Sequence, residues 1–364
     1  MKNTIYLLFL LFFHPPLHAQ GEKGQDVPPA GQKDTSAFNE VLETAYLLTA
    51  IGKYEDAHAY FTFVMKDFSD KQVYNNAGVV AILAARNYFR PNEPEVKFHY
   101  PIELDLVSKG KKGGNDFKEI RTRLLREAIS HFDAAIHLDT GYAPAYLNRA
   151  CAYALLDEVP KAQSEANRAA ALRGYDKTAV DVQVLMGILH ARLGDSEKAK
   201  AYFESAVKQG STLAANNLKK LEGGEIPAPS GTFDLPGGIE TIDNISLTDP
   251  NNIPEPDPNS EIALTSQIRL YHNLNPGPNS RFYFSDNTAT GQQTFFLLTG
   301  PGYAGQTEKK LKIGAARAEI EAAYKEPLRR VETPAGEIRV YPSIILLLGK
   351  DGELAQWAIF GEDG

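Results

Sequence analysis

Histidines and the single cysteine are the side chains from which acid–base, nucleophilic or metal chemistry is expected first. His131 and His137 are six residues apart on a predicted helix, so they lie on different faces, which disfavours a shared metal. The chain has no H-E-x-x-H motif, no G-x-S-x-G turn, no phosphate-binding P-loop and no G-x-G-x-x-G after a strand. Cys151 falls inside a predicted helix, where a thiol packs as a small apolar group. The sequence therefore predicts no catalytic residue and no cofactor.

Oxygen-rich and basic clusters are the next candidates for ligand binding. The stretches 249–252 and 255–259 could offer oxygen ligands to calcium, but they lack a glycine-centred calcium loop, so no metal site is predicted. The lysines of 109–112 could meet an acidic partner or lipid headgroups, although a solvated loop is the simpler interpretation. A net charge of −8 at pH 7 disfavours nucleic acid as a partner.

A pattern that recurs about every 34 residues indicates which elements carry the chain's function. A small residue follows each turn, and an aromatic or second small residue follows one helical turn later. The copies are Gly52, Tyr54, Ala57, Phe61 and Val64; Ala128, Phe132 and Ala135; Asp157, Ala162, Ala166 and Ala169; and Gly194, Ser196, Ala199, Phe203 and Ala206. Small residues let two helices approach closely, and the aromatic residues fill the space between hairpins. The pattern resembles the tetratricopeptide repeat (TPR), which implies an array of helical hairpins that binds other proteins.

The second repeat is interrupted by an insertion over about 88–120. We expect repeats at 38–71, 72–140, 143–176 and 180–213, with a capping helix over 214–222. The alanine expected near position 91 comes only at Ala128, and three prolines forbid a continuous helix between them. The insertion carries apolar side chains that have no place in a standard hairpin: Phe98, Tyr100, Ile102 and Leu104. They either cover the groove of the repeats as an internal plug, which we favour, or are presented to a partner.

The predicted concave face of the repeats is mostly apolar. Asn148, in the run Tyr-Leu-Asn-Arg-Ala, resembles the asparagine with which TPR proteins hold acidic tails. The flanking positions of the first and fourth repeats supply no lysine or arginine, so a carboxylate clamp is not expected. The candidate binding residues are Leu42, Tyr46, Asn76, Val80, Leu147, Asn148, Val184 and Ile188. This stripe favours an apolar or amphipathic segment of a partner protein.

The composition changes after residue 223. Residues 225–265 contain eight acidic residues, seven prolines and no lysine or arginine, which predicts an extended linker. From residue 266 onward the chain alternates as strands separated by turn residues, with one amphipathic helix over 315–326. The expected strands are 267–274, 281–285, 294–299, 337–341, 344–348 and 354–360. A small α+β domain with an antiparallel sheet and one helix is therefore predicted over 266–364.

Part of this domain resembles bacterial envelope modules related to outer-membrane assembly lipoproteins and β-lactamase-inhibitor-like domains. The matching residues are the pair Ile313-Gly314, the helix positions Glu319, Ile320 and Tyr324, then Pro327, Trp357 and Phe360. Lys325 and Glu326 stand where those modules have a glycine. The resemblance implies a binding fold without catalytic residues, and it makes Trp357 the candidate for an exposed aromatic patch.

The N-terminus predicts export. Residues 1–19 combine one lysine, a nine-residue apolar run and Ala19 before a polar start, which is typical of a signal peptide. That run is too short to span a bilayer, so no membrane span is expected after cleavage. The predicted domains are thus 1–19 signal peptide, 20–37 disordered, 38–224 TPR, 225–265 linker and 266–364 α+β.

These features together favour a non-catalytic scaffold or assembly factor of the bacterial envelope or periplasm, with a protein as its partner. The alternatives are an enzyme with an unrecognised site in the C-terminal domain, or a regulator of a secreted hydrolase that acts through the patch around Trp357.

Overall fold

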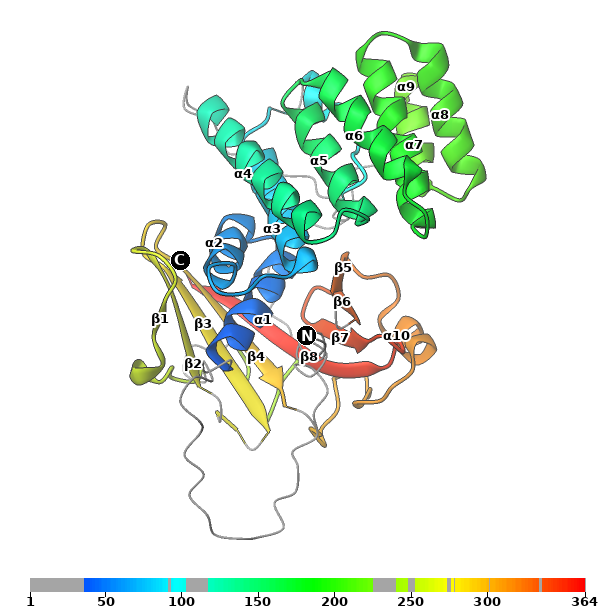
Figure 1. Cartoon of the computed structure of the whole chain (residues 1–364). Coiled ribbons are helices and arrows are strands. Elements are labelled where there is room, and N and C mark those ends of the chain that lie inside the picture. Colours follow the sequence, from blue (N-terminus) through cyan, green and yellow to red (C-terminus); the bar gives the residue numbers. More distant parts are fainter. Residues whose placement is uncertain are drawn as a thin grey trace, which may run out of the picture. The chain divides into compact units, whose positions relative to one another are not determined.

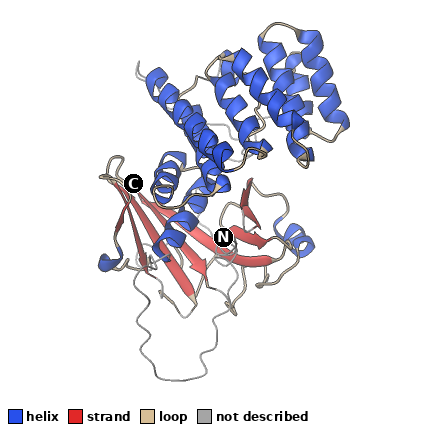
Figure 2. Ribbon diagram, in the orientation of Figure 1, coloured by secondary structure: helices blue, strands red, loops and turns tan. Residues whose placement is uncertain are grey.

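The computed structural model describes residues 36–90, 93–102, 117–224, 240–247, 253–273, 276–277, 279–300, 302–333 and 336–363. The predicted signal peptide lies outside these ranges. The described chain forms paired helices followed by an antiparallel sheet, which confirms the predicted fold class (Figure 2). It divides into two compact units: Met65–Ser230, the helical unit, and Met1–Val64 with Gly231–Gly364, the sheet unit.

The helical unit consists of antiparallel hairpins and a terminal helix (Figure 1). Its helices are α3 (Lys71–Arg86), α4 (Phe117–Leu138), α5 (Ala143–Leu155), α6 (Val159–Ala171), α7 (Asp176–Arg192), α8 (Ser196–Lys208) and α9 (Thr212–Leu221). They coincide with the predicted second, third and fourth repeats and with the capping helix. Asp70 begins α3 by accepting hydrogen bonds from the backbone N–H groups of Gln72 and Val73 at 2.8 and 3.0 Å.

In each of two hairpins of this unit, a phenylalanine ring on one helix packs against a glycine of the other helix. A Cβ atom on Gly78 of α3 would lie 2.4 Å from the ring of Phe132 on α4. A Cβ atom on Gly187 of α7 would lie 2.5 Å from the ring of Phe203 on α8. Both rings are fully buried. A glycine inside a helix costs stability, and here the close approach of the aromatic ring requires it.

The sheet unit contains eight antiparallel strands in the order β1-β2-β3-β4-β8-β7-β6-β5. They are β1 (Ile262–Ala263), β2 (Ile268–Asn273), β3 (Ser280–Asn287), β4 (Gln292–Thr299), β5 (Arg329–Thr333), β6 (Gly336–Val340), β7 (Ile345–Gly349) and β8 (Leu354–Asp363). The helix α10 (Arg317–Tyr324) and the short 3₁₀ turn η4 (Pro258–Ser260) interrupt them. All six predicted strands and the predicted helix are present, whereas β1 and β5 were not predicted.

Helices cover both faces of this sheet. Successive side chains of β3 point to opposite faces of the sheet. Arg281 and Tyr283 contact the hairpin formed by α1 (Ser36–Ile51) and α2 (Tyr54–Val64) on one face, and Phe282 lies in the core on the other face. Ile320 of α10 lies in that opposite core, fully buried. Gly52, with φ +88°, ends α1 at the position where the sequence predicts the first turn.

The structure changes the predicted domain division in two places. The hairpin α1–α2 is grouped with the sheet, although the sequence predicts it as the first repeat of one helical domain over 38–224. Several contacts join the hairpin to the sheet, among them the ion pair of Glu43 with Arg281 of β3 and the hydrogen bond of Tyr60 with Ser285. The predicted linker over 225–265 is also partly folded: Ile242 and Leu247 are buried in the core of the sheet unit, since their apolar side chains pack there.

Candidate peptide-binding site

Residues 93–102 of the insertion contact the last helices of the helical unit, and Glu93 at their start also pairs with Arg121 of α4. This segment begins with the 3₁₀ turn η2 (Pro94–Val96) and continues without regular secondary structure. Phe98, Tyr100 and Ile102 are only 3, 3 and 4 % exposed. The fourth predicted insertion residue, Leu104, lies outside the described residues. The apolar side chains that have no place in a standard hairpin are thus buried in the same unit.

Asn217 of α9 holds the main chain of this segment. Its Nδ2 donates to the carbonyl oxygen of His99 at 2.8 Å, and its Oδ1 accepts from the N–H of His99 at 2.9 Å. The Asn217 side chain is fully buried, although the two residues are 118 positions apart. A carboxamide offers one donor and one acceptor, which matches the two polar groups of one extended residue. This pair of hydrogen bonds binds a peptide backbone whatever side chain that residue carries.

Aromatic side chains on either side of His99 complete the contact. The Phe98 ring lies 6.1 Å from the Phe203 ring of α8, in a tilted arrangement. The Tyr100 hydroxyl accepts a hydrogen bond from Nη1 of Arg192, at the end of α7, at 3.2 Å. Burial raises the pKa of Tyr100 to about 12, so the phenol stays protonated at neutral pH. Three helices therefore supply one clamp and two side-chain contacts.

Arg192 is itself fixed from two other directions. It donates to the carbonyl oxygen of Ala154 at the end of α5, and its Nη2 contacts Asp157 at 2.6 Å. Its side chain is only 6 % exposed. These two contacts hold the guanidinium group of Arg192 in place independently of Tyr100. A binding site keeps its geometry when its side chains are fixed in this way.

Cations gather at the N-terminal side of this segment. Burial lowers the pKa of Lys220 on α9, and the neighbouring positive charges of Lys97 and Arg86 lower it further. The Lys97 ammonium also lies 5.5 Å from the centroid of the Phe98 ring. The start of the same segment is acidic, and Glu93 there pairs with Arg121 of α4.

Most side chains of the predicted concave stripe are buried in the core of one unit or the other. Val80, Leu147, Val184 and Ile188 are at most 4 % exposed in the helical unit. Tyr46, 4 % exposed, packs edge to face against Phe61 in the sheet unit, and its helix α1 also carries the half-buried Leu42. Side chains buried to this degree contribute to packing and offer little surface to a partner.

The two predicted polar members of the stripe differ from each other. Asn148 is buried and donates through Nδ2 to Oδ1 of Asn75 at 2.9 Å, so it links α5 to α3. Asn76 is half-buried on α3. Cys151, on the same helix as Asn148, is fully buried, and burial raises the pKa of its thiol. An inert thiol is what the sequence predicts there.

A dense set of charged contacts holds the hairpin α1–α2 on the sheet. Glu43 accepts from both Nη atoms of Arg281 at 2.9 and 3.1 Å and from the Tyr283 hydroxyl at 2.7 Å. Burial disfavours the Arg281 cation, but the Glu43 carboxylate outweighs it and raises the pKa of Arg281. Burial, then Glu43, raises the pKa of Tyr283. Arg281 and Tyr283, whose pKa values are shifted, thus both bind Glu43 where the hairpin packs on the sheet.

The same contact continues along both helices. The Tyr60 hydroxyl of α2 donates to Ser285 of β3 at 2.7 Å, and Asn287 donates to Asp56. Arg329 of β5 donates to the carbonyl oxygens of Thr49 and Ala50 at the end of α1. A cation at the carboxyl end of a helix is favoured by the helix dipole. The hairpin α1–α2 is thus joined to β3 and β5 on this face of the sheet.

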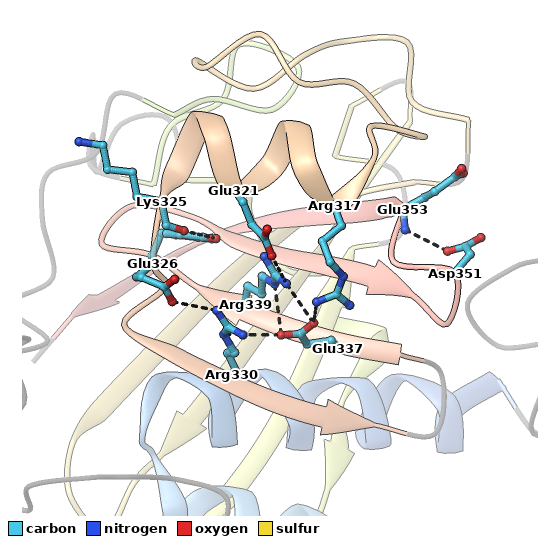
Figure 3. A network of polar contacts seen from close by, with 10 residues as sticks. Arg317, Glu321, Lys325, Glu326, Arg330, Glu337, Arg339, Asp351 and Glu353 are labelled. Atoms are coloured by element: carbon cyan, nitrogen blue, oxygen red, sulfur yellow. Dashed lines mark hydrogen bonds and ion pairs between the residues drawn. The ribbon is translucent and has the colours of Figure 1, made fainter. Parts of the chain in front are cut away.

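A second charged network fixes α10 on the sheet (Figure 3). Arg339 of β6 is fully buried and contacts Glu321 of α10 at 3.1 Å and Glu337 at 3.2 Å. Arg317 at the start of α10 also reaches Glu337, at 2.9 Å. The positive charges of the arginines and the negative charges of the glutamates neutralise one another, and the ion pairs link α10 to β6.

Trp357 is not the exposed patch that the sequence predicts. It is fully buried in the core beneath α10 and meets the Tyr303 ring edge to face at 5.2 Å. Its position on β8 turns it toward that core together with Ile359. The interpretation of this domain as an inhibitor that acts through Trp357 therefore loses its supporting feature.

The described residues contain neither a candidate metal site nor a membrane-spanning helix. Within those ranges no three His, Cys, Asp or Glu side chains come together in a way that could hold a metal ion. Among the helices described, none is both long and apolar enough to cross a membrane.

Comparisons with known proteins show similarity only to solved structures. No protein-family model matches the chain, and no curated protein matches it. A thermophilic TPR protein of Thermus thermophilus is 20 % identical, with a TM-score of 0.29, over 51 % of this chain and 99 % of its own. A MamA fragment from Desulfovibrio magneticus is 15 % identical, with a TM-score of 0.24, over 48 % of this chain and 96 % of its own.

Proposed function

We propose that this chain is a protein-interaction scaffold whose helical unit binds an extended segment of a partner protein. The observation that carries the proposal is the pair of hydrogen bonds between Asn217 and the main chain of His99. Such a clamp recognises extended backbone, and the aromatic contacts on either side of it select side chains. The helical unit thus already binds a peptide of the kind that a scaffold would take from a partner.

The proposed setting is the bacterial envelope, and the proposed role is a non-catalytic adaptor or assembly factor. The signal-peptide pattern of residues 1–19 supports export. The resemblance of the C-terminal domain to envelope modules supports the same compartment. A fusion of residues 1–60 to alkaline phosphatase, which is active only after export, tests this part. An inactive fusion that is made in normal amounts would place the protein inside the cell.

Site-specific photo-crosslinking in intact cells tests the scaffold function. A photoreactive amino acid at Lys220, beside the insertion, should give discrete adducts with one or a few proteins. The matched control is Lys208, which is exposed in the last turn of α8 of the same unit. Adducts at Lys220 and none at Lys208 are the expected result. Equal yields at both positions, or no adduct at Lys220, would reject the helical unit as the binding surface.

A further inference from the structure

The insertion is bound in the helical unit as a ligand would be. The hairpin α3–α4 that contains it is closed by its own contacts, since Phe132 packs on Gly78. The side chains of Phe98 and Tyr100 and the main chain of His99 contact α8, α7 and α9, respectively. The start of the segment stays with its own hairpin, where Glu93 pairs with Arg121 of α4. Residues 98–100 instead contact a surface that is remote in sequence.

Most of what holds the segment would hold another peptide equally well. The Asn217 clamp reads only main-chain atoms of His99. The other contacts require an aromatic ring before that residue and a hydroxylated aromatic ring after it. The required pattern is thus an extended aromatic-x-tyrosine segment.

The charges of the segment differ in how they are matched: Glu93 is paired with Arg121 of α4, whereas the Lys97 ammonium lies only against the Phe98 ring among the contacts of its side chain described above. Lys97 is exposed and stands immediately before the first aromatic residue. It lies near Lys220 and Arg86, both positive. An acidic residue at that position of a ligand would replace repulsion by attraction.

We infer that residues 93–102 are an intramolecular stand-in for a partner, and that the partner presents an extended acidic-aromatic-x-tyrosine segment that displaces them. This inference rests on the proposed function and names the partner's chemistry and its regulation. A tethered segment competes at an effective concentration on the order of millimolar, so only a better-matched ligand opens the site.

Peptide binding to three forms of the full chain tests the inference by fluorescence anisotropy. The probes are a labelled peptide of residues 94–102, its Lys97→Glu form and a scrambled control. The chains are the wild type, a vacated Phe98→Ala/Tyr100→Ala variant, and the vacated variant with Asn217→Ala. The vacated variant should bind the native peptide at least tenfold more tightly than the wild type does. The Lys97→Glu peptide should bind several-fold more tightly still, with the difference shrinking at high salt.

Three results would overturn the inference. The first is equal binding by the wild type and the vacated variant, which would make the segment a permanent part of the fold. The second is a Lys97→Glu peptide that binds no better than the native one. The third is full binding after Asn217→Ala, which should lower affinity at least tenfold.

In case the Phe98→Ala/Tyr100→Ala chain fails to fold, a second variant tests the inference without changing a buried residue. Lys97→Glu in the intact chain should close the site, so hydrogen exchange at the His99 amide should slow and binding of the native peptide should weaken. Unchanged or faster exchange contradicts the charge argument. Adducts at Lys220 in cells together with a failure of these peptide experiments would refute the inference and leave the scaffold function standing.

Discussion

Two segments of this chain are each bound by a surface remote in sequence, and they are bound by different chemistry. The hairpin α1–α2 is held on the sheet by buried, paired charges such as Glu43 with Arg281. The insertion is held on α7, α8 and α9 by a main-chain clamp and aromatic contacts. A buried charge that loses its partner is costly, whereas a main-chain clamp accepts any extended peptide. The first contact is therefore built to be permanent and the second to be exchanged.

The largest expected effects compare two phenylalanines that touch each other. Phe203→Ala should lower the unfolding free energy of the helical unit by about 3–5 kcal/mol, because the ring is fully buried between helices. Phe98→Ala should cost less than about half as much, since the cost cannot exceed the free energy with which the insertion docks. Urea unfolding of both variants measures the difference. Equal losses would mean that the insertion belongs to the core.

Breaking the charged contact of the sheet unit should have the next largest effect. Glu43→Leu should cost about 3 kcal/mol, because it leaves Arg281 and Tyr283 without their acceptor. Adding Arg281→Met should restore most of the loss. As a control, Glu326→Gln, two residues after the end of α10 and 89 % exposed, should change stability by less than about 0.5 kcal/mol. A double variant no better than Glu43→Leu would show that shape, and not charge, holds the hairpin.

A smaller effect tests the rigidity of the surface under the insertion. Gly187→Ala should cost about 1–3 kcal/mol, since the added Cβ would meet the Phe203 ring. Combining it with Phe203→Leu should recover part of that cost, because the smaller side chain makes room. Calorimetry of the single and double variants gives the coupling. Additive effects would contradict the packing seen between α7 and α8.

The smallest effect concerns an ion pair at the surface of the helical unit. Lys71 and Asp139 are 2.5 Å apart, and their side chains are 37 and 34 % exposed, so Lys71→Met should cost less than about 1 kcal/mol at pH 7. The Lys71 hydrogen bond lowers the pKa of Asp139 below 3.8, and the Asp139 hydrogen bond raises the pKa of Lys71 above 10.5.

The pH dependence of this pair has a definite sign. The contribution of Asp139 is complete above about pH 4 and is lost as the pH falls through its lowered pKa. The contribution of Lys71 is lost as the pH rises through its raised pKa. The stability difference between wild type and Lys71→Met should therefore shrink as the pH falls from about 4 through the lowered pKa of Asp139. A difference that does not shrink would assign the effect to packing of the lysine stem.

The sequence predicts elements whose signals are local. The repeat helices follow from small and aromatic residues at fixed spacing, and six strands follow from alternation. Strand β5 was missed because Arg329, Arg330 and Glu332 hide its alternation among charges. The grouping of α1–α2 with the sheet could not be predicted, since Glu43 and Arg281 are 238 residues apart.

The candidate site shows the same division. Phe98, Tyr100 and Ile102 stood out because apolar residues in an insertion must be covered somewhere. Asn217 and Arg192 gave no signal, because an asparagine in a polar helix and an arginine at a helix end are ordinary in isolation. Trp357 was misassigned because the sequence does not say which face of β8 meets α10.

The sequence of the helical unit is nested between the two parts of the sheet unit, and this order affects synthesis on the ribosome. Glu43 emerges 238 residues before Arg281. At about 5–20 residues per second, α1–α2 would wait roughly 10–50 s for its sheet. The helical unit is completed within that interval and can fold first. Glu43 therefore stays without its Arg281 partner until the helical unit has been synthesised, so the contact between hairpin and sheet is a late step of folding.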